Sequence, residues 1–237
     1  MFINTTYRTE EKEIMDDLSL HDAEIKDVFE DINTVNHYLG GNKITLNGIQ
    51  QLIKNIPKGK EITITDLGCG DGEMLAYCAR YARKYKHNFK LSGIDINPQI
   101  IEEAKEKMKN FPEITFINED VYSKEFAKNK VDIFLCTLTL HHFDDNQIEN
   151  LLATLSNQAR LGIVINDLHR NKLAYGLFKM FSSFFLKTKI AKNDGLVSIL
   201  RGFKRKELET FSNKLNSNKH TINWKWAFRY QWIIQKQ

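Results

Sequence analysis

The chain has 237 residues, of which 42% are hydrophobic, and its 34 basic residues stand against 30 acidic ones. This length fits one domain with a small appended part, and the hydrophobic share excludes a globally disordered chain. The net charge of +4 is milder than that of most dedicated nucleic-acid binders, although it leaves an RNA partner open.

The cysteines and the apolar segments indicate in which cellular compartment the protein is expected. Three cysteines without regular spacing predict neither a disulfide framework nor a zinc site, and we expect no metal. The N-terminus lacks the basic and then apolar pattern of a signal peptide. The apolar run Leu173 to Leu186 contains Lys179 and is shorter than the roughly 20 residues that span a bilayer. We therefore expect a cytoplasmic protein without a transmembrane segment.

The first 56 residues predict a helical extension or lid. Residues 1–21 are polar and acidic and predict a mobile or weakly helical lead-in, with the carboxylates Glu10, Glu11, Glu13, Asp16 and Asp17. Apolar residues at helical spacing predict a helix over Asp22–Tyr38, which the glycines at 40 and 41 end. A second helix is expected around Leu46–Asn55, before Pro57.

Strand and helix patterns alternate through the central part of the chain. The expected strands are 62–67, 89–95, 114–117, 131–136 and 161–165, and the expected helices are 72–86, 98–110 and 145–158. Such alternation predicts a parallel sheet with helices on both faces, within a domain of residues 57–237. The pattern then changes to a helical insert at about 168–200, a helix at 204–215, and a strand or hairpin at 221–235.

The glycine-rich loop from Asp66 to Gly72 follows the first expected strand and precedes a helix. Glycines at the carboxyl end of a strand let the backbone approach a ligand closely, and the helix start offers free N–H groups. Asp95 ends the next strand, 23 residues past Gly72, where a carboxylate accepts ribose hydroxyls. Asp120 follows the third strand, with Val121 beside it.

With these features, residues of about 60–170 resemble the class I S-adenosylmethionine-dependent methyltransferases. The resemblance implies a Rossmann-like α/β fold with a mixed seven-stranded sheet, an N-terminal helical pair and a helical cap after the fifth strand. It implies a loop around the methionine part of the cofactor, ribose bonding by Asp95, and adenine contacts from Ile96, Asp120 and Val121. The implied cofactor-binding residues are Asp66, Gly68, Cys69, Gly70, Gly72, Asp95, Ile96, Asp120, Val121, Cys136 and Thr137.

The competing ligand is a nicotinamide dinucleotide. Its fingerprint needs the third glycine one residue later than Gly72, where Glu73 stands. Asp66 would repel a pyrophosphate, whereas it suits a cofactor that carries an ammonium and a sulfonium. The sequence therefore favours S-adenosylmethionine.

The segment after the fourth strand, Thr137-Leu-Thr-Leu-His-His-Phe, resembles the small-molecule branch of that family. The Asn/Asp-Pro-Pro motif of enzymes that modify base amino groups is absent, and so is a Pro-Cys nucleophile. His141 and His142 are candidates for a general base or for the pocket wall. The alternative for each is a local capping role at the next helix.

A second pair of candidates follows the fifth strand. His169 is a candidate general base, and Arg170 a candidate for binding a substrate carboxylate or phenolate. The alternative is a salt-bridged loop. Residues from Asp167 to Arg205 also resemble, more loosely, a bacterial branch associated with polyketide, quinone and pigment biosynthesis.

The helical insert places Tyr175, Phe178, Phe181 and Phe185 roughly on one face. These aromatic residues predict a roof over a flat, apolar substrate. Packing on the N-terminal helices is equally compatible, and the lysines at 187, 189 and 192 keep peripheral membrane contact open.

We predict methyl transfer from S-adenosylmethionine to a hydroxyl or activated carbon of a small, apolar or aromatic metabolite, in secondary metabolism, with no nucleic-acid partner. The alternatives are an RNA (tRNA) methyltransferase and a non-catalytic cofactor-binding scaffold. The predicted catalytic residues are His169, His142 and His141, and the predicted substrate-binding residues are Arg170, Tyr175, Phe178 and Phe181.

Overall fold

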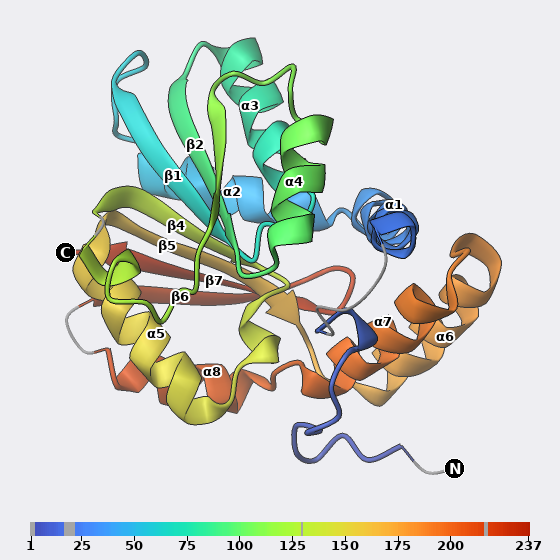
Figure 1. Ribbon diagram of the computed structural model, residues 1–237. Coiled ribbons are helices and arrows are strands. Elements are labelled where there is room, and N and C mark those ends of the chain that lie inside the picture. Colours follow the sequence, from blue (N-terminus) through green and yellow to red (C-terminus); the bar gives the residue numbers. More distant parts are fainter. Residues whose placement is uncertain (1–2, 17–21, 129, 216–217) are drawn as a thin grey trace.

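The structure is a computed structural model that describes residues 3–16, 22–128, 130–215 and 218–237. Over these residues the chain forms one seven-stranded sheet in the order β3-β2-β1-β4-β5-β7-β6 (Figure 1). The strands are β1 (Glu61–Leu67), β2 (Asn88–Asp95), β3 (Ile114–Asn118), β4 (Val131–Thr137), β5 (Ala159–Leu168), β6 (Asn218–Lys225) and β7 (Arg229–Lys236). β1 to β5 pair in parallel and β7 runs antiparallel to both neighbours, which confirms the mixed Rossmann-like sheet.

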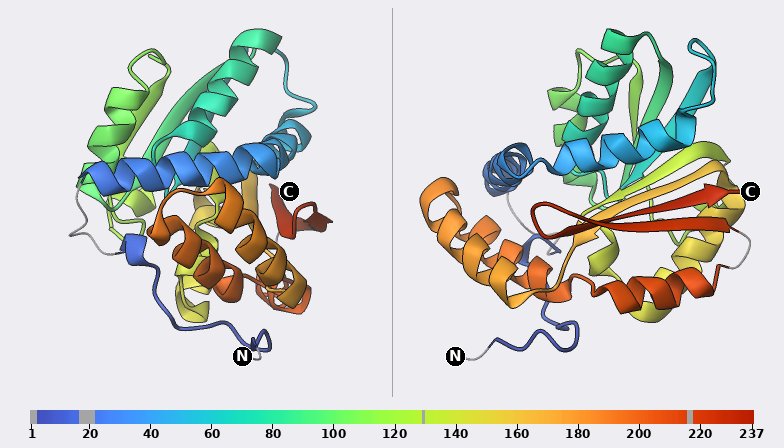
Figure 2. Two further views of the ribbon diagram at one scale, coloured as in Figure 1. Left: turned by 90° about the vertical axis from the view of Figure 1, so that its right-hand side faces the viewer. Right: turned by 180° about the vertical axis from the view of Figure 1, so that it is seen from behind.

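Helices cover both faces of this sheet. The helices are α1 (Asp22–Tyr38), α2 (Gly41–Ile53), α3 (Glu73–Tyr85), α4 (Pro98–Lys107), α5 (Asp145–Gln158), α6 (Lys172–Phe185), α7 (Lys189–Arg201) and α8 (Arg205–Asn213), with short 3-10 turns η1 (Ile14–Asp16), η2 (Phe126–Lys128) and η3 (Leu140–His142). α2, α3 and α4 share one hydrophobic core with the sheet, and α5 and α8 share a second core on the other face. α1, α6 and α7 gather at one end of the molecule (Figures 1 and 2).

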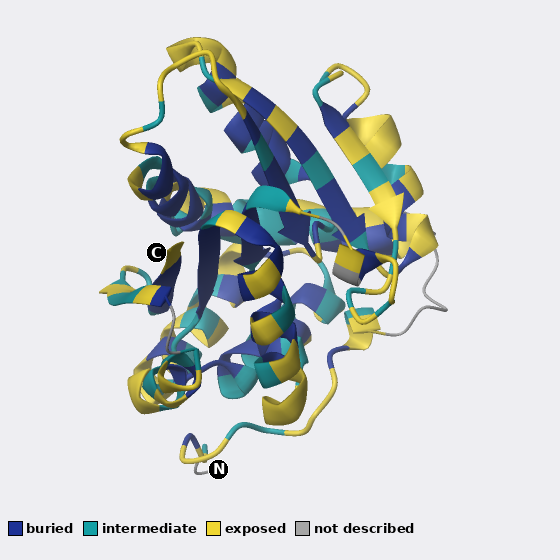
Figure 3. Ribbon diagram, turned by 90° about the vertical axis from the view of Figure 1, so that its left-hand side faces the viewer, coloured by how far each residue is buried: buried dark blue, intermediate teal, exposed yellow. Residues whose placement is uncertain are grey.

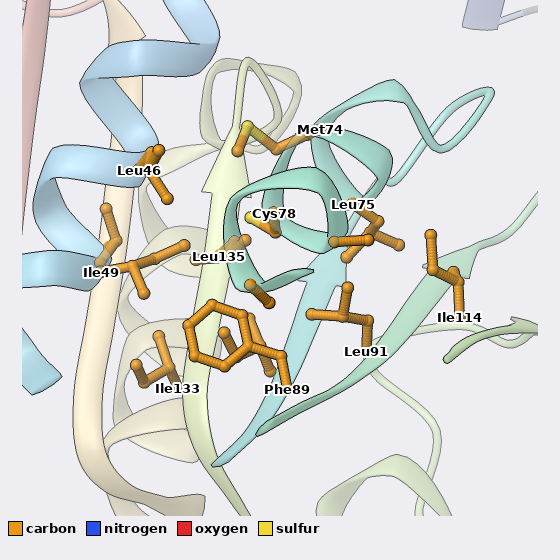
Figure 4. Packing of buried hydrophobic residues seen from close by; sticks show 14 of the residues in the cluster. Leu46, Ile49, Met74, Leu75, Cys78, Phe89, Leu91, Ile114, Ile133 and Leu135 are labelled. Atoms are coloured by element: carbon orange, nitrogen blue, oxygen red, sulfur yellow. The ribbon is translucent and has the colours of Figure 1, made fainter. Parts of the chain in front are cut away.

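Apolar packing on the sheet explains the two layers. In the first core, Leu91 of β2 and Leu135 of β4 pack together with Leu75 and Cys78 of α3, and all four are buried (Figure 4). Figure 3 shows the same pattern at larger scale, with buried strands and helices that are buried on their inner sides. Burial of such side chains contributes about 1.5–3 kcal/mol each, which makes these layers the rigid frame of the site.

The N-terminal part differs from the expectation in two places. The helix expected at Leu46–Asn55 begins at Gly41 and ends at Ile53, because Gly40 adopts φ +70° and turns the chain directly into α2. Residues 3–16 of the acidic lead-in contact the rest of the protein and include η1. Asp17 lies outside the described residues. The domain boundary at residue 57 stays a prediction. α2, which precedes that boundary, packs against β5 and β7, which follow it.

The C-terminal elements agree with the expected pattern. The insert forms α6 and α7, and the alternating aromatic segment forms the β6–β7 hairpin. None of the helices in the described ranges combines the length and apolar character needed to cross a bilayer.

Candidate active site

A cavity of about 1550 Å³ opens where the carboxyl ends of β1, β2 and β4 meet the N-terminal segment, α1, α6 and α7. This volume exceeds the roughly 300–1,000 Å³ of a typical single-ligand pocket, so that a cofactor and an acceptor fit together. The predicted cofactor residues that line it are Asp66, Gly68, Cys69, Gly70, Asp95, Ile96, Asp120, Val121 and Thr137.

The loop after β1 brings its backbone close to its surroundings. Gly68 and Gly70 have φ values of +63° and +52°, a region that side chains disfavour. A Cβ on Gly68 would lie 2.7 Å from the Thr139 side chain, and one on Gly70 would lie 2.7 Å from the Phe29 ring. Only glycine therefore fits at both positions, as the sequence pattern predicts.

Asp66 offers a buried carboxylate oxygen to the cavity. Its Oδ1 atom has no hydrogen-bond partner among the described residues. Burial raises the pKa of Asp66 well above its usual range, and the negative charge of Asp95 raises it further. A cationic ligand group would satisfy this oxygen, and the ammonium of S-adenosylmethionine fits that requirement.

Asp95 lies at the end of β2 and is held by backbone N–H groups. Gly70 N donates to Oδ2 at 3.2 Å and Asn97 N donates to Oδ1 at 3.0 Å. Burial raises the pKa of Asp95, although these two N–H groups oppose the rise. The carboxylate is thus oriented beside the glycine loop, where it would accept ribose hydroxyls.

The part of the cavity beside the ends of β2 and β3 is more open. Ile96 is 58% exposed, which leaves an apolar side chain ready to be covered by a flat ring. Asp120 is exposed and caps the following turn by accepting from Tyr122 N at 2.9 Å. Ile96, Asp120 and Val121 all line the cavity, as their positions after β2 and β3 predict.

Two predicted cofactor residues do not line this cavity. Gly72 is the N-cap of α3, with φ +80°. Cys136 is fully buried in the second hydrophobic core, because alternation along β4 turns it into the sheet while Thr137 faces the cavity.

A cluster of ionisable side chains forms the opposite wall. His141, in η3, is buried between two carboxylates: its Nδ1 lies 2.7 Å from Asp167 Oδ1 and its Nε2 lies 3.2 Å from Glu13 Oε1. His142 is partly exposed, and its Nδ1 lies 3.0 Å from Asp16 Oδ1. The His142 Nε2 lies 3.8 Å from Glu13 Oε2, so that both imidazoles converge on one carboxylate.

The charges in this cluster are mutually stabilising. Burial alone would lower the pKa of His141, but Asp167 and Glu13 outweigh it and raise the pKa to about 10. Burial alone would raise the pKa of Glu13, but His141 and His142 hold it below its usual value. His141 is therefore a fixed cation near neutral pH, and Glu13 is a fixed anion.

The ligand atoms of Glu13, His141 and His142 lie within 4.8 Å of one another, as in a metal site. A doubly protonated His141 donates through both nitrogens, to Asp167 and to Glu13, and has no lone pair for a metal. Hydrogen bonds and ion pairs thus explain why Glu13, His141 and His142 lie so close together.

The N-terminal segment, residues 3–16, is fastened over the cavity. Arg8 donates to the backbone oxygens of His141 and Phe143 at 2.9 and 2.6 Å. The Asp194 carboxylate of α7 accepts from Ile14 N and Met15 N, both at 2.9 Å. These bonds position Glu13 and Asp16, which the sequence did not single out, because nothing in an acidic lead-in shows where it docks.

Only two of the four aromatic residues predicted on one face of α6 line the large cavity. Phe178 and Phe181 line the cavity, as predicted, whereas Tyr175 is not among its lining residues. Phe185 is 51% exposed and stacks on Phe181. The wall is therefore apolar opposite the ionisable cluster.

His169 and Arg170 lie elsewhere, in a second, smaller cavity. Leu168 faces the large cavity, and successive residues of an extended chain point to opposite sides, so His169 turns away from it. The His169 Nδ1 accepts from Trp224 Nε1 at 3.2 Å. The Arg170 guanidinium is buried, where it pairs with Glu207 and donates to backbone oxygens of Thr5 and Thr6. The structure thus does not bring this pair together with His141 and His142.

Residues 64–162 match a family model described as a methyltransferase domain. This part of the chain is a methyltransferase domain, and it lies within the Rossmann-like sheet described above. S-adenosylmethionine is the cofactor of this family, which confirms the cofactor prediction.

Curated relatives carry the same domain. The chain is 27% identical over 157 residues to malonyl-[acyl-carrier protein] O-methyltransferase 1 of Ilyobacter polytropus, an alignment that covers 65% of this chain and 53% of the relative. It is 26% identical over 153 residues to the ubiquinone/menaquinone biosynthesis C-methyltransferase of Campylobacter jejuni, which covers 62% of each. The alignments thus span 53% and 62% of the length of these two relatives.

Solved structures agree in fold over nearly the whole chain. The plantazolicin methyltransferase BamL, crystallised with a triazolic desmethylPZN analog and SAH, has a TM-score of 0.65 and 15% identity, over 91% of this chain and 98% of that one. At this identity the likeness concerns the fold, and it extends beyond the methyltransferase domain to the N-terminal and C-terminal elements.

Proposed function

We propose that this protein transfers a methyl group from S-adenosylmethionine to a hydroxyl or activated carbon of a small, apolar or aromatic metabolite. One observation carries the proposal: a single large cavity joins the glycine loop to an ionisable cluster and an apolar wall. In this proposal the loop binds the cofactor, the ionisable cluster accepts the proton of the acceptor, and the apolar wall packs on the acceptor's ring.

On the cofactor side, the Asp66 oxygen receives the ammonium, the loop backbone approaches the methionine part, and Asp95 accepts the ribose hydroxyls. Ile96 packs on the adenine, with Asp120 and Val121 at its edge. When bound, S-adenosylmethionine would supply the methyl group to the acceptor oxygen or carbon. These residues hold the cofactor and exclude water, and alignment of the reactants lowers the barrier.

On the acceptor side, His142 is the proposed proton acceptor. It is partly exposed in the cavity wall, and Asp16 at its Nδ1 orients the ring. The Nε2 of His142 takes the proton as the new bond to the methyl group forms and S-adenosylhomocysteine leaves. His141, already protonated, fixes Glu13 beside that nitrogen. A catalytic role for His169 stays a sequence prediction.

The acceptor class follows from the cavity wall. Phe178, Phe181 and Leu186 line the acceptor side, which favours an apolar or flat molecule over a nucleic acid. The two curated relatives are named as an O-methyltransferase and a C-methyltransferase, which supports both oxygen and activated carbon as acceptor atoms.

The cofactor half is tested by calorimetry with S-adenosylhomocysteine. The unmodified protein should bind it, and Asp95→Ala should weaken binding by about 1–3 kcal/mol through loss of charge-assisted hydrogen bonds. Glu102→Ala, which removes an exposed carboxylate on α4, is the matched control and should leave the affinity unchanged.

Equal affinity in Asp95→Ala would remove Asp95 from the site. Binding of NADH in place of S-adenosylhomocysteine would contradict the cofactor assignment itself.

A further inference from the structure

The outer surface of α6 carries a row of exposed apolar side chains, here called the α6 stripe. It consists of Leu173, Leu177, Met180 and Phe184, which are 60%, 37%, 58% and 81% exposed. Their spacing places all four along one side of the helix. The neighbouring side of the helix packs inward through Ala174, Phe178 and Phe181, so the fold does not need the stripe for its own core.

Basic residues accompany the stripe. Lys172 and Lys179 are exposed and stand seven residues apart along one flank of it. Residues 172–201, which form α6 and α7, contain six basic side chains and one acidic one. That acid, Asp194, is buried and accepts from the N-terminal segment. The helical pair thus concentrates more positive charge than the +4 of the whole chain.

The position of the helix suits a flat partner. α6 lies at the edge of the molecule, with α7 between it and the sheet (Figures 1 and 2). The stripe runs along a convex helix surface, which matches a plane better than it matches the groove of a protein partner. An exposed apolar side flanked by lysines is typical of helices that lie in the headgroup region of an anionic bilayer.

We propose that α6 docks the protein on an anionic lipid surface, with the stripe in the headgroup region and the lysines on the lipid phosphates. Leu177 and Met180 also line the large cavity, as does Trp226, which is 65% exposed at the β6–β7 turn. The bilayer surface therefore lies against the mouth of the cavity. A membrane-dissolved apolar acceptor then enters without crossing water. This last step rests on the proposed function, whereas the docking does not.

The test is sedimentation of the full chain with vesicles of phosphatidylcholine alone or with added phosphatidylglycerol. We expect binding to the anionic vesicles, weaker binding to the neutral ones, and a loss of binding as salt screens the lysines. Phe184→Glu should weaken binding about tenfold or more, because it removes an aromatic ring that would be buried in the lipid headgroup region. Lys179→Glu should weaken it roughly fivefold to thirtyfold.

The matched controls are Tyr85→Glu and Lys84→Glu, an exposed aromatic residue and a lysine at the end of α3, far from α6 (Figure 1). Both should bind vesicles as the unmodified protein does. All four variants should keep their affinity for S-adenosylhomocysteine, which separates this test from that of the proposed function. Failure of the unmodified protein to bind anionic vesicles would overturn the proposal and point to an acidic protein as occupant. Equal binding by Phe184→Glu and Tyr85→Glu would also overturn it.

Discussion

At the scale of single residues, the three candidate histidines differ in what surrounds them. His141 is buried between Asp167 and Glu13 and stays protonated, which suits a structural cation and not a base. His142 lines the large cavity with Asp16 behind it. His169 lines the small cavity, and burial and the nearby cations of Lys204 and Arg170 lower its pKa.

We predict that His142→Ala lowers methyl transfer by about 10²–10⁴-fold, because the acceptor loses its proton acceptor. His169→Ala serves as the comparison and should change the rate little. Formation of S-adenosylhomocysteine from S-adenosylmethionine in the presence of phenolic or β-dicarbonyl acceptors measures the rate of both variants, and calorimetry should find cofactor affinity unchanged. The opposite ranking would return the catalytic role to His169.

At the scale of elements, the N-terminal segment completes the site. Arg8, Arg201 and Asp194 fasten residues 3–16 to η3 and α7, which places Glu13 and Asp16 beside the histidines. Arg8 also lies over the Phe203 ring, 4.8 Å from its centroid. Loss of these contacts would free the segment and leave the histidines without their carboxylates.

Arg8→Ala should therefore speed hydrogen exchange at residues 13–16 by about tenfold or more, since each lost charge-assisted bond contributes about 1.5–3 kcal/mol. Arg205→Ala removes an exposed arginine paired with Glu209 on α8 and is the control. Exchange at β1 and α3 should stay unchanged in both variants. Equal protection of residues 13–16 in Arg8→Ala would show that other contacts hold the segment.

At the scale of the whole molecule, the His141 network ties together parts that are distant in sequence. Asp167 stands at the end of β5, His141 follows β4, and Glu13 belongs to the N-terminal segment. Because the pKa of His141 is raised from 6.5 to about 10 in the folded state, its contribution to stability is complete below pH 6.5. It is lost as the pH rises towards 10, because the unfolded state then binds fewer protons.

The melting temperature of the unmodified protein should thus fall between pH 7 and pH 10. His141→Gln should be less stable at pH 7 by about 3–5 kcal/mol, because it leaves Asp167 buried without its cation. Its melting temperature should change less over the same pH range, as measured by scanning calorimetry. Parallel pH profiles for the two proteins would contradict the assignment of this slope to His141.

Much of this protein follows from local sequence patterns. The alternation of strand and helix patterns predicted the α/β sheet, and α1 and α5 were predicted at the residues where they occur. The loop from Asp66 to Gly72 predicted a close approach of the backbone to its surroundings, because its glycine φ values and the following helix are short-range properties. The sequence also predicted that Asp95 and Asp120 lie near this loop, since parallel strands end at one edge of a sheet.

The acceptor end was decided by tertiary structure. Glu13 and His141 are separated by 128 residues, and no periodicity or motif links an acidic lead-in to a histidine after β4. Whether His169 faces the large or the small cavity depends on the residue at which β5 ends and on its register with β7. Sequence patterns do not specify the end or the register of a strand to within one residue. The sequence by itself thus determined the sheet and the glycine loop after β1, which depend on neighbours in the chain. Only the folded chain decided the ionisable cluster, because its members are brought together by long-range docking of the N-terminal segment.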